Sequence, residues 1–168
     1  SSAPSEWYKG QVCNVTAEHP DAGNNLLDAL RQCLSDADPT VRKNAVQAVE
    51  YISREHPHDV WKAVSDIIPL YTDQNKKIQN GSDWIFTNII GSYPENVENV
   101  VADLQPFLSE SETQITRKTT DILADIAAEH PAAVRSALPA LRSLLSTNDT
   151  ETRQHTTQVL TSLSAEHP

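Results

Sequence analysis

Four Glu-His pairs are the residues of this sequence whose types could bind a metal ion. They are Glu18-His19, Glu55-His56, Glu129-His130 and Glu166-His167, and a proline follows each one. Imidazole nitrogen and carboxylate oxygen are both common metal ligands. One pair offers only two ligands, so a metal site would need two pairs within reach of one ion. Whether two pairs can meet depends on the elements that carry them.

The prolines after these pairs, together with Pro94, mark a regular period. They stand at residues 20, 57, 94, 131 and 168, so each interval is 37 residues. Self-similarity at such a period is the signature of a solenoid, in which each repeat buries its apolar face against its neighbours. Neighbouring repeats lie about 10 Å apart, which is too far for two pairs to share one ion. We therefore predict that these histidines end helices, and we expect no metal and no cofactor.

Each repeat contains two amphipathic helices and two short polar turns. In the fourth repeat the first helix carries Val134, Leu138 and Leu141 on one face, and the third repeat has apolar residues at the same offsets. The second helix is also one-sided, as Ile115 and Ile122 show in the third repeat. Spacings of three, four and seven residues mark an α-helix. Two helices fill 37 residues, so the sequence predicts an all-α chain.

The domain that we expect is a single solenoid over residues 1–168. It consists of a half repeat and four full repeats, which span 1–20, 21–57, 58–94, 95–131 and 132–168. The chain begins at Ser1, contains no methionine and stops on a repeat boundary, with no capping repeat after Leu160. Because solenoids normally need polar capping repeats, we expect this chain to be a piece of a longer protein.

The turn at 36–42, Asp-Ala-Asp-Pro-Thr-Val-Arg, follows an amphipathic helix. Together with Leu138-Pro139-Ala140-Leu141, and with Pro69 and Pro106 inside first helices, this turn resembles the HEAT-repeat family. The resemblance covers residues 21–168. It implies an α-α superhelix, a solenoid of antiparallel helix pairs in which the second helices line the concave face and prolines bend the first helices.

The resemblance also implies a ladder between repeats, built from turn aspartates and arginines early in second helices. Asp36 and Arg42 match this ladder, and Asp73, Glu110 and Arg153 match it in part. Such residues are structural, and each exposed ion pair contributes roughly 0–1 kcal/mol. The second repeat departs from the family pattern, because Asn80-Gly81-Ser82 weakens its second helix and leaves the start of that helix open.

Trp84 carries the strongest binding signal. It lies opposite the apolar residues Ile78, Ile85 and Ile89, and the equivalent positions of the other repeats are polar. On the concave face that the resemblance implies, an exposed tryptophan would be a hot-spot anchor for a partner. The alternative is that Gly81 rotates the helix and buries the ring. The expected partner-binding set is Trp84, Tyr51, Gln47, Asn88, Asp121 and Asp125.

The charge balance bears on the class of partner. With 23 acidic and 13 basic residues, the chain has a net charge of −10. This excess argues against general nucleic-acid affinity and favours a protein partner with a basic or mixed surface. No constellation of residues suggests catalysis. The function that we expect is a non-catalytic protein-interaction scaffold or adaptor, with a purely structural spacer as a further possibility.

Basic residues at second-helix starts support an alternative hypothesis. Stacked repeats would align Lys43, Lys76, Lys77, Arg117 and Lys118 into a ridge that could contact phosphates. HEAT-like DNA glycosylases hold DNA on a cationic concave face, so the alternative is a nucleic-acid-binding or glycosylase-like protein. Acidic residues flank the ridge, which favours a charge-balanced turn region instead.

Several features indicate the cellular setting. Cys13 and Cys33 provide neither metal spacing nor a disulfide framework. Cys33 occupies an apolar helix position, so we expect it to be buried, and an exposed Cys13 suits a reducing compartment. We expect no membrane association, because no apolar run approaches about 18 residues, and we expect a cytoplasmic location. The acid-rich, lysine-poor composition also resembles that of proteins from salt-loving organisms, although an ordinary acidic protein explains it equally well.

Overall fold

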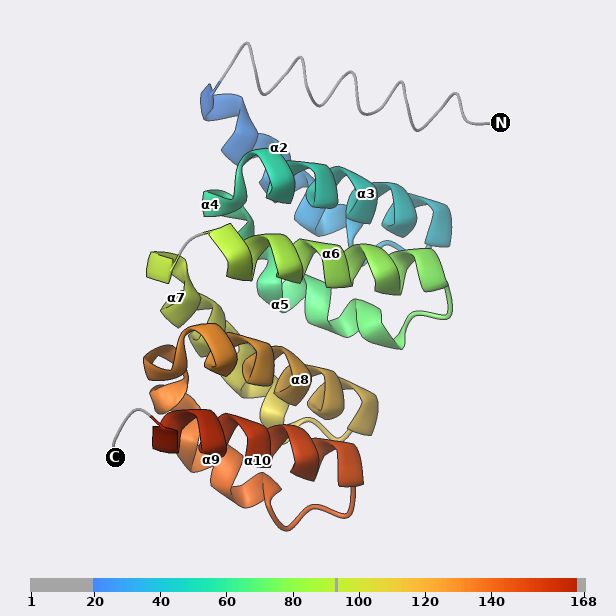
Figure 1. The fold of residues 1–168 in the computed structure, drawn as a ribbon. Coiled ribbons are helices and arrows are strands. Elements are labelled where there is room, and N and C mark those ends of the chain that lie inside the picture. Colours follow the sequence, from blue (N-terminus) through green and yellow to red (C-terminus); the bar gives the residue numbers. More distant parts are fainter. Residues whose placement is uncertain (1–19, 93, 166–168) are drawn as a thin grey trace. The chain divides into compact units, whose positions relative to one another are not determined.

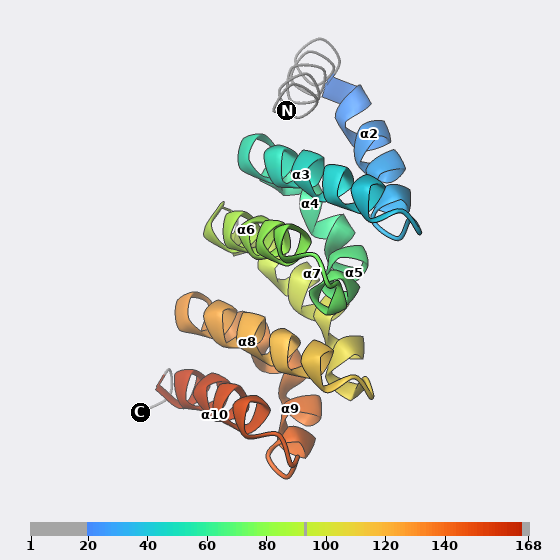
Figure 2. The ribbon, with the colours of Figure 1, turned by 90° about the vertical axis from the view of Figure 1, so that its right-hand side faces the viewer.

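The computed structural model describes residues 20–92 and 94–165 (Figures 1 and 2). Every regular element in these ranges is an α-helix or a short 3-10 helix, which confirms the predicted all-α fold of helix pairs. The chain divides into two compact units, one ending at Ile89 and the other beginning at Ile90. The half repeat before Pro20, with Cys13, and the last Glu-His-Pro at 166–168 lie outside the described residues. The single solenoid over 1–168 stays a prediction.

The first unit contains two successive helix pairs. Its elements are α2 (Pro20–Cys33), α3 (Pro39–Glu55), α4 (Pro57–Val60), η1 (Trp61–Ala63), α5 (Val64–Ile67), η2 (Ile68–Thr72) and α6 (Lys76–Ser92), which belongs to this unit as far as Ile89. The first helix of the second pair is thus a succession of short segments. The two second helices, α3 and α6, lie side by side (Figures 1 and 2).

The second unit has the same construction. Its elements are α7 (Pro94–Leu104), η3 (Gln105–Ser109), α8 (Thr113–Glu129), η4 (Pro131–Ala137), α9 (Leu138–Leu144) and α10 (Thr150–Ala165). The second helices α8 and α10 pack against each other along their length (Figure 1). Their buried faces meet α7, η4 and α9 through residues such as Ile126, Val134 and Leu141.

Proline determines where the first helices begin and where they are interrupted. A helix starts at Pro20, Pro57 and Pro94, and a 3-10 helix starts at Pro131, as the sequence predicts. Within the first helices, Pro69 and Pro106 each stand in the first turn of a 3-10 segment, and Pro139 stands in the first turn of α9. Because proline lacks an N–H group and its ring clashes with the preceding turn, a regular α-helix cannot pass through these positions unbroken.

Gly81 lies inside a continuous helix. α6 begins at Lys76 and runs through Gly81, so the second helix of this repeat is not weakened at its start. No described residue has a positive φ, and Gly81 is therefore not needed for its conformational freedom. A Cβ at this position would instead collide with Cγ1 of Val46 on α3. Glycine allows the close approach of α3 and α6.

One contact recurs in all four full repeats. A side chain early in the second helix donates a hydrogen bond to the carbonyl oxygen six residues before it, in the preceding turn. The four pairs are Arg42 to Asp36 (2.7 Å), Gln79 to Asp73 (2.6 Å), Thr116 to Glu110 (3.2 Å) and Arg153 to Thr147 (2.7 Å). Arginine, glutamine and threonine all satisfy this carbonyl, so the turn geometry persists where the sequence changes.

Two further observations complete the fold. Cys33 is a free thiol at a partly exposed position at the end of α2, so the predicted full burial of this residue is wrong. Leu30 and Leu34, four residues apart, carry the buried face of this segment, and Cys33 lies beside that face. Within 20–92 and 94–165, no helix combines the length and the apolar character that a membrane crossing requires.

Candidate functional site

Trp84 is the most exposed large apolar side chain that the structure describes. Its neighbours Ile85 and Phe86 on α6 are buried, whereas 59% of Trp84 is accessible to solvent. The prediction that this side chain points away from the core is therefore confirmed, and the alternative that Gly81 buries the ring is wrong. Its role in binding stays a prediction.

The other predicted residues of the first unit surround the line where α3 meets α6. Gln47 and Tyr51 on α3 occupy the positions equivalent to Trp84 and Asn88 on α6. Gln47 is exposed, while Tyr51 and Asn88 are partly buried. The Asn88 Nδ2 group donates to Oγ of Ser53 at 2.8 Å, so this amide joins the two helices. Asn88 thus has a structural contact in addition to the proposed binding role.

Glu50 is a residue of this surface that sequence reasoning missed. Its Oε2 atom lies 3.7 Å from the place that a Cβ on Gly81 would occupy. A helical side chain leans over the turn before its own Cα, so Trp84 extends toward the same turn of α6. The spacing of Glu50 and Arg54 predicts the ion pair that they form at 3.3 Å. Only the structure shows that this carboxylate stands where α3 and α6 meet.

Asp121 and Asp125, the remaining predicted residues, lie on α8 in the second unit. The Asp121 carboxylate pairs with Lys118 Nζ at 3.2 Å and lies 3.6 Å from His155 Nε2 on α10. Partial burial and the neighbouring Asp121 carboxylate raise the pKa of Asp125. Removal from water and a like charge both disfavour the ionised form. A cationic group from a partner would relieve this cost.

The predicted basic ridge is largely engaged in internal contacts. Arg117 pairs with Asp149 at 2.6 Å and with Glu151 at 3.3 Å, and Lys76 Nζ donates to Gln79 at 2.9 Å. Lys118 is the partner of Asp121 described above. In the part of the chain that the structure describes, Lys43 and Lys77 are the only members of the ridge whose side chains form neither an ion pair nor a hydrogen bond.

Three arginine–aspartate pairs join successive repeats within the units, and one of them is the contact of Arg31 Nε with the Asp66 carboxylate at 2.6 Å. In the first unit, Arg42 Nε contacts the Asp73 carboxylate at 2.8 Å. Burial opposes ionisation of Asp73, but hydrogen bonds from the Asn75 N–H group and from Arg42 prevail, and its pKa is lowered. In the second unit, hydrogen bonds from Arg117 and Thr152 lower the pKa of Asp149 below its usual range. The pair of Arg42 and Asp73 joins two residues of the predicted ladder, whereas Arg117 and Asp149 were not among its predicted members.

The two Glu-His pairs that the structure describes, at 55–56 and 129–130, stand at helix ends. The backbone N–H groups of His56 and His130 donate to Ile52 and Ile126 at 2.7 Å, and both histidines cap the C-termini of their helices, α3 and α8. Among the described residues, no group of three or more His, Cys, Asp or Glu side chains is placed to hold a metal ion. These two pairs therefore have a structural explanation, and the other two lie outside the described residues.

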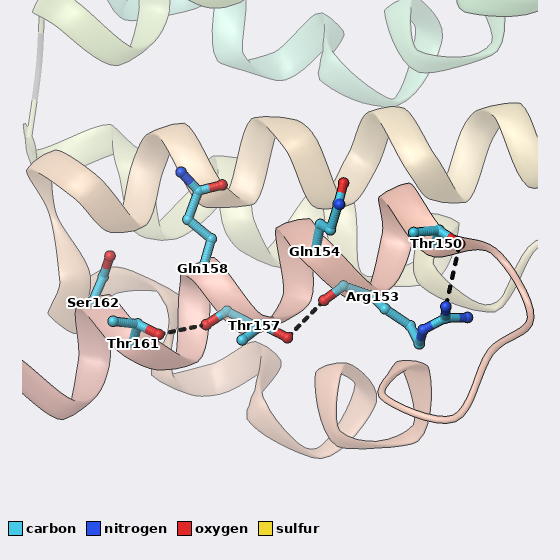
Figure 3. A pocket seen from close by; sticks show the side chains of 7 residues that line it. All are labelled: Thr150, Arg153, Gln154, Thr157, Gln158, Thr161 and Ser162. Carbon is cyan, nitrogen blue, oxygen red and sulfur yellow. Dashed lines mark hydrogen bonds between the residues drawn. The ribbon is translucent and has the colours of Figure 1, made fainter.

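An open cavity of about 560 Å³ runs along the outer side of α10 between Thr150 and Ser162. All seven residues of its lining lie on α10, and they are threonine, serine, glutamine and arginine. Figure 3 shows the hydroxyl groups of Thr157 and Thr161 bonded back along their own helix, while Arg153 reaches Thr150. The polar groups of this lining do not point toward a common centre, as those of a small-molecule site would.

The chain is similar to one known protein family and to several solved structures. Residues 13–124 match the family model of Cnd1, non-SMC mitotic condensation complex subunit 1. This region exceeds half of the chain and includes α2 to α7 and most of α8. No curated protein sequence matches the chain.

Several solved helical-repeat structures share the fold. A TOG-domain structure of Crescerin, which regulates microtubules in the primary cilium, has a TM-score of 0.73 and 13% identity, covering 98% of this chain and 71% of that one. A TOG structure concerned with tubulin binding specificity has a TM-score of 0.66 and 15% identity, covering 85% and 63%. A designed armadillo repeat protein in complex with the peptide (KR)4 has a TM-score of 0.53 and 23% identity, covering 82% and 64%. This chain spans less than two thirds of the last two. The matches confirm the HEAT-type resemblance.

Proposed function

This chain belongs to the Cnd1 family of non-SMC mitotic condensation complex subunits, and from that premise we propose that it is a non-catalytic module for protein–protein interaction. The single observation that carries the proposal is the exposure of Trp84, at 59%, on a second helix whose neighbouring apolar residues are buried. Tryptophan is enriched among residues that dominate binding energy, because it contributes a large rigid area. A soluble helix gains nothing from exposing it.

The proposed partner-binding residues form two separate groups, Trp84, Gln47, Tyr51 and Asn88 in the first unit and Asp121 and Asp125 in the second. Glu50, beside Gly81, adds a carboxylate to the first group. In the first unit, a basic partner side chain could meet the indole face of Trp84 through cation–π contact, and another could pair with the Glu50 carboxylate. In the second unit, basic side chains could pair with Asp121 and Asp125. The net charge of −10 would speed the approach of such a partner.

The structural neighbours support the proposal only in part. A designed armadillo protein binds the peptide (KR)4, and a TOG domain binds tubulin, so solenoids of this fold present protein-binding surfaces. At these low identities the likeness extends to the fold alone. The location proposed for this module is the cytoplasm, and the proposed domain is one solenoid over residues 1–168, with the half repeat 1–20 and the full repeats 21–57, 58–94, 95–131 and 132–168.

Nucleic-acid binding has less support. Arg117 and Lys118 are paired with carboxylates, and Lys43 and Lys77 remain on a chain with ten more negative than positive charges. Phosphate binding relies on several unpaired cations at once. This alternative is an outcome that the experiment below distinguishes.

The proposal is tested by capture of partners from the source lysate with three immobilised chains: wild type, Trp84→Ala and Gln158→Ala. Gln158 occupies the position equivalent to Trp84 on α10 and is exposed, so its variant controls for the loss of a large side chain there. We expect a protein that wild type and Gln158→Ala retain and Trp84→Ala loses. Equal capture by all three, or nucleic acid that salt removes from all three, would overturn the proposal.

A further inference from the structure

Glu50 and Trp84 both depart from the repeat pattern, and they stand on the neighbouring helices α3 and α6. The positions equivalent to Glu50 in the other full repeats hold threonine or alanine, and those equivalent to Trp84 hold glutamine or aspartate. Because three of the four repeats stack without a charge at the position of Glu50, the fold does not require a carboxylate there. Its presence beside the exposed tryptophan needs another explanation.

The Glu50 carboxylate lies within the reach of one side chain from the indole of Trp84. Its Oε2 atom is 3.7 Å from the place that a Cβ on Gly81 would occupy. Residues three apart on a helix have Cβ positions about 5–6 Å apart, and the Trp84 side chain leans toward the turn of Gly81. A guanidinium is planar, so it can stack on an indole and bond to a carboxylate at the same time. One arginine could therefore contact both residues.

Two contacts fix the spacing of α3 and α6 around this place. Val46 lies so close to Gly81 that no Cβ would fit between them. Seven residues after Gly81, the Asn88 amide donates to Oγ of Ser53 at 2.8 Å, and Ser53 is fully buried. A site whose backbone is already in position loses less conformational freedom when a partner binds.

In the free chain, Glu50 has an exchangeable partner in Arg54, one turn further along α3. Arg54 Nη2 lies 3.3 Å from Oε1 of Glu50, and this is the only side-chain bond that the carboxylate accepts from the residues that the structure describes. The pair of Arg42 and Asp73 between repeats is closer, at 2.8 Å. The Arg54 side chain is 59% exposed, against 21% for that of Arg42. An exposed pair within one helix contributes little, so another cation could replace Arg54 at small cost.

We infer that this place receives an arginine side chain of the protein partner, which stacks on the indole of Trp84 and takes the Glu50 carboxylate from Arg54. Arg54 then competes with the partner and lowers its affinity, while Trp84 and Glu50 together select arginine over lysine. Lysine carries a compact charge without the planar fork that stacks and bonds at once. The inference rests on the proposed function and narrows its basic partner to one residue type.

The test measures by NMR titration how the full chain binds a Gly-Arg-Gly tripeptide, blocked at both ends, and its lysine counterpart. Trp84→Ala identifies the indole N–H signal of Trp84 among those of the three tryptophans. We expect the arginine tripeptide to shift this signal and to bind more tightly than the lysine one. Glu50→Gln should weaken binding of the arginine tripeptide about fivefold. Glu98→Gln, which removes an exposed charge from α7, should leave it nearly unchanged.

The competition by Arg54 has a separate signature. Arg54→Ala should strengthen binding of the arginine tripeptide about twofold, because it frees the Glu50 carboxylate. In the Glu50→Gln background, Arg54→Ala should have no effect on binding, whereas a general effect of removing one positive charge would persist there. Circular dichroism checks that each variant retains the helical content of the wild type.

Four results would overturn the inference. The arginine tripeptide could leave the Trp84 signal unmoved, or the lysine tripeptide could bind as tightly. Glu50→Gln and Glu98→Gln could weaken binding equally, which would indicate attraction by net charge alone. Arg54→Ala could strengthen binding equally with and without Glu50.

Capture from the source lysate separates failure of this inference from failure of the proposed function. A partner that Trp84→Ala loses and Glu50→Gln retains in full would leave the proposed function standing and refute the arginine site. A partner that Trp84→Ala retains would refute both.

Discussion

The two units have different side chains at one pair of equivalent positions, where their second helices meet. Where α3 meets α6, Val46 faces Gly81 so closely that a Cβ would not fit. Where α8 meets α10, the equivalent residues are Thr120 and His155, with Thr120 Oγ1 3.5 Å from His155 Nδ1. A backbone contact in one unit is replaced by a contact between polar side chains in the other. The helix pairing is therefore preserved by two different means, shape in the first unit and polar interactions in the second.

This difference extends to the exposed surface. Gly81 brings α3 near the turn over which Trp84 leans, and the first unit exposes an aromatic ring there. In the second unit, His155 lies beside Asp121, and the surface carries carboxylates. The first unit thus exposes apolar area at this position, and the second unit exposes charge.

The largest expected effect comes from filling the space at Gly81. Alanine is normally the better helix residue by about 1 kcal/mol, but Gly81→Ala should destabilise the chain by about 1–3 kcal/mol because Val46 must move. Urea unfolding followed by circular dichroism measures this. Val46→Ala should recover much of the loss, and His155→Ala at the equivalent place should cost less. A more stable Gly81→Ala chain would contradict the claim that shape closes the first unit.

The second largest expected effect is the loss of an aspartate that caps a helix. The two aspartates compared are Asp38, which only caps its helix, and Asp149, which also pairs with an arginine. Asp38 accepts a hydrogen bond from the Thr40 N–H group at the start of α3, and its loss in Asp38→Ala should cost about 1 kcal/mol. Asp149 accepts from the Thr152 N–H group at the start of α10 and also binds Arg117. Asp149→Ala should therefore lower the urea midpoint more than Asp38→Ala. Equal losses would show that the Arg117 pair contributes nothing to stability.

Carboxylates of the second unit should respond to pH in opposite directions. The pKa of Asp149 is lowered from its ordinary value near 3.8, so its contribution is present above that pH and is lost as pH falls further. The pKa of Asp125 is raised, so its ionised form costs stability at neutral pH.

Asp125→Asn should consequently raise the urea midpoint at pH 7 and leave it unchanged at pH 3, where the carboxyl is protonated in both states. Asp149→Asn should lower the midpoint at pH 7 and have less effect at pH 3. Comparing the variants at these two pH values tests both signs. Effects of the same sign for both variants at pH 7 would contradict this electrostatic account.

The smallest expected effect is on the stability of Trp84→Ala. An exposed side chain away from the core usually contributes within about 0.5 kcal/mol, so its unfolding free energy should match that of Gln158→Ala. A loss of several times this amount would show that the ring packs against the fold, and would weaken the binding proposal.

Much of the fold could be predicted from the sequence because it depends on periodicity. The 37-residue interval and the prolines that start first helices locate the helix pairs, and the polarity of positions equivalent to Trp84 predicts its exposure. These features are local or repeat along the chain. They require only helix geometry and the backbone chemistry of proline.

The contacts between repeats could not be predicted from the sequence in the same way. Arg117 stands one residue later in its repeat than Arg42 does, and it binds Asp149, which stands two residues later than Asp73. A long guanidinium can reach several places in the next turn, so its partner depends on the exact approach of two helices. The role of Gly81 depends on the same approach. Sequence pattern indicates the helices but not the distance between them.

The measurement that tests the central claim most directly is photocrosslinking from a single position in the source lysate. A photoreactive amino acid is placed at position 84 in one chain and at the equivalent position 158 in another. We predict a dominant protein adduct from position 84 that an excess of unlabelled wild type competes away and an excess of Trp84→Ala does not. The same adducts from both positions, or adducts that the Trp84→Ala chain removes as well as wild type does, would contradict a partner site at Trp84.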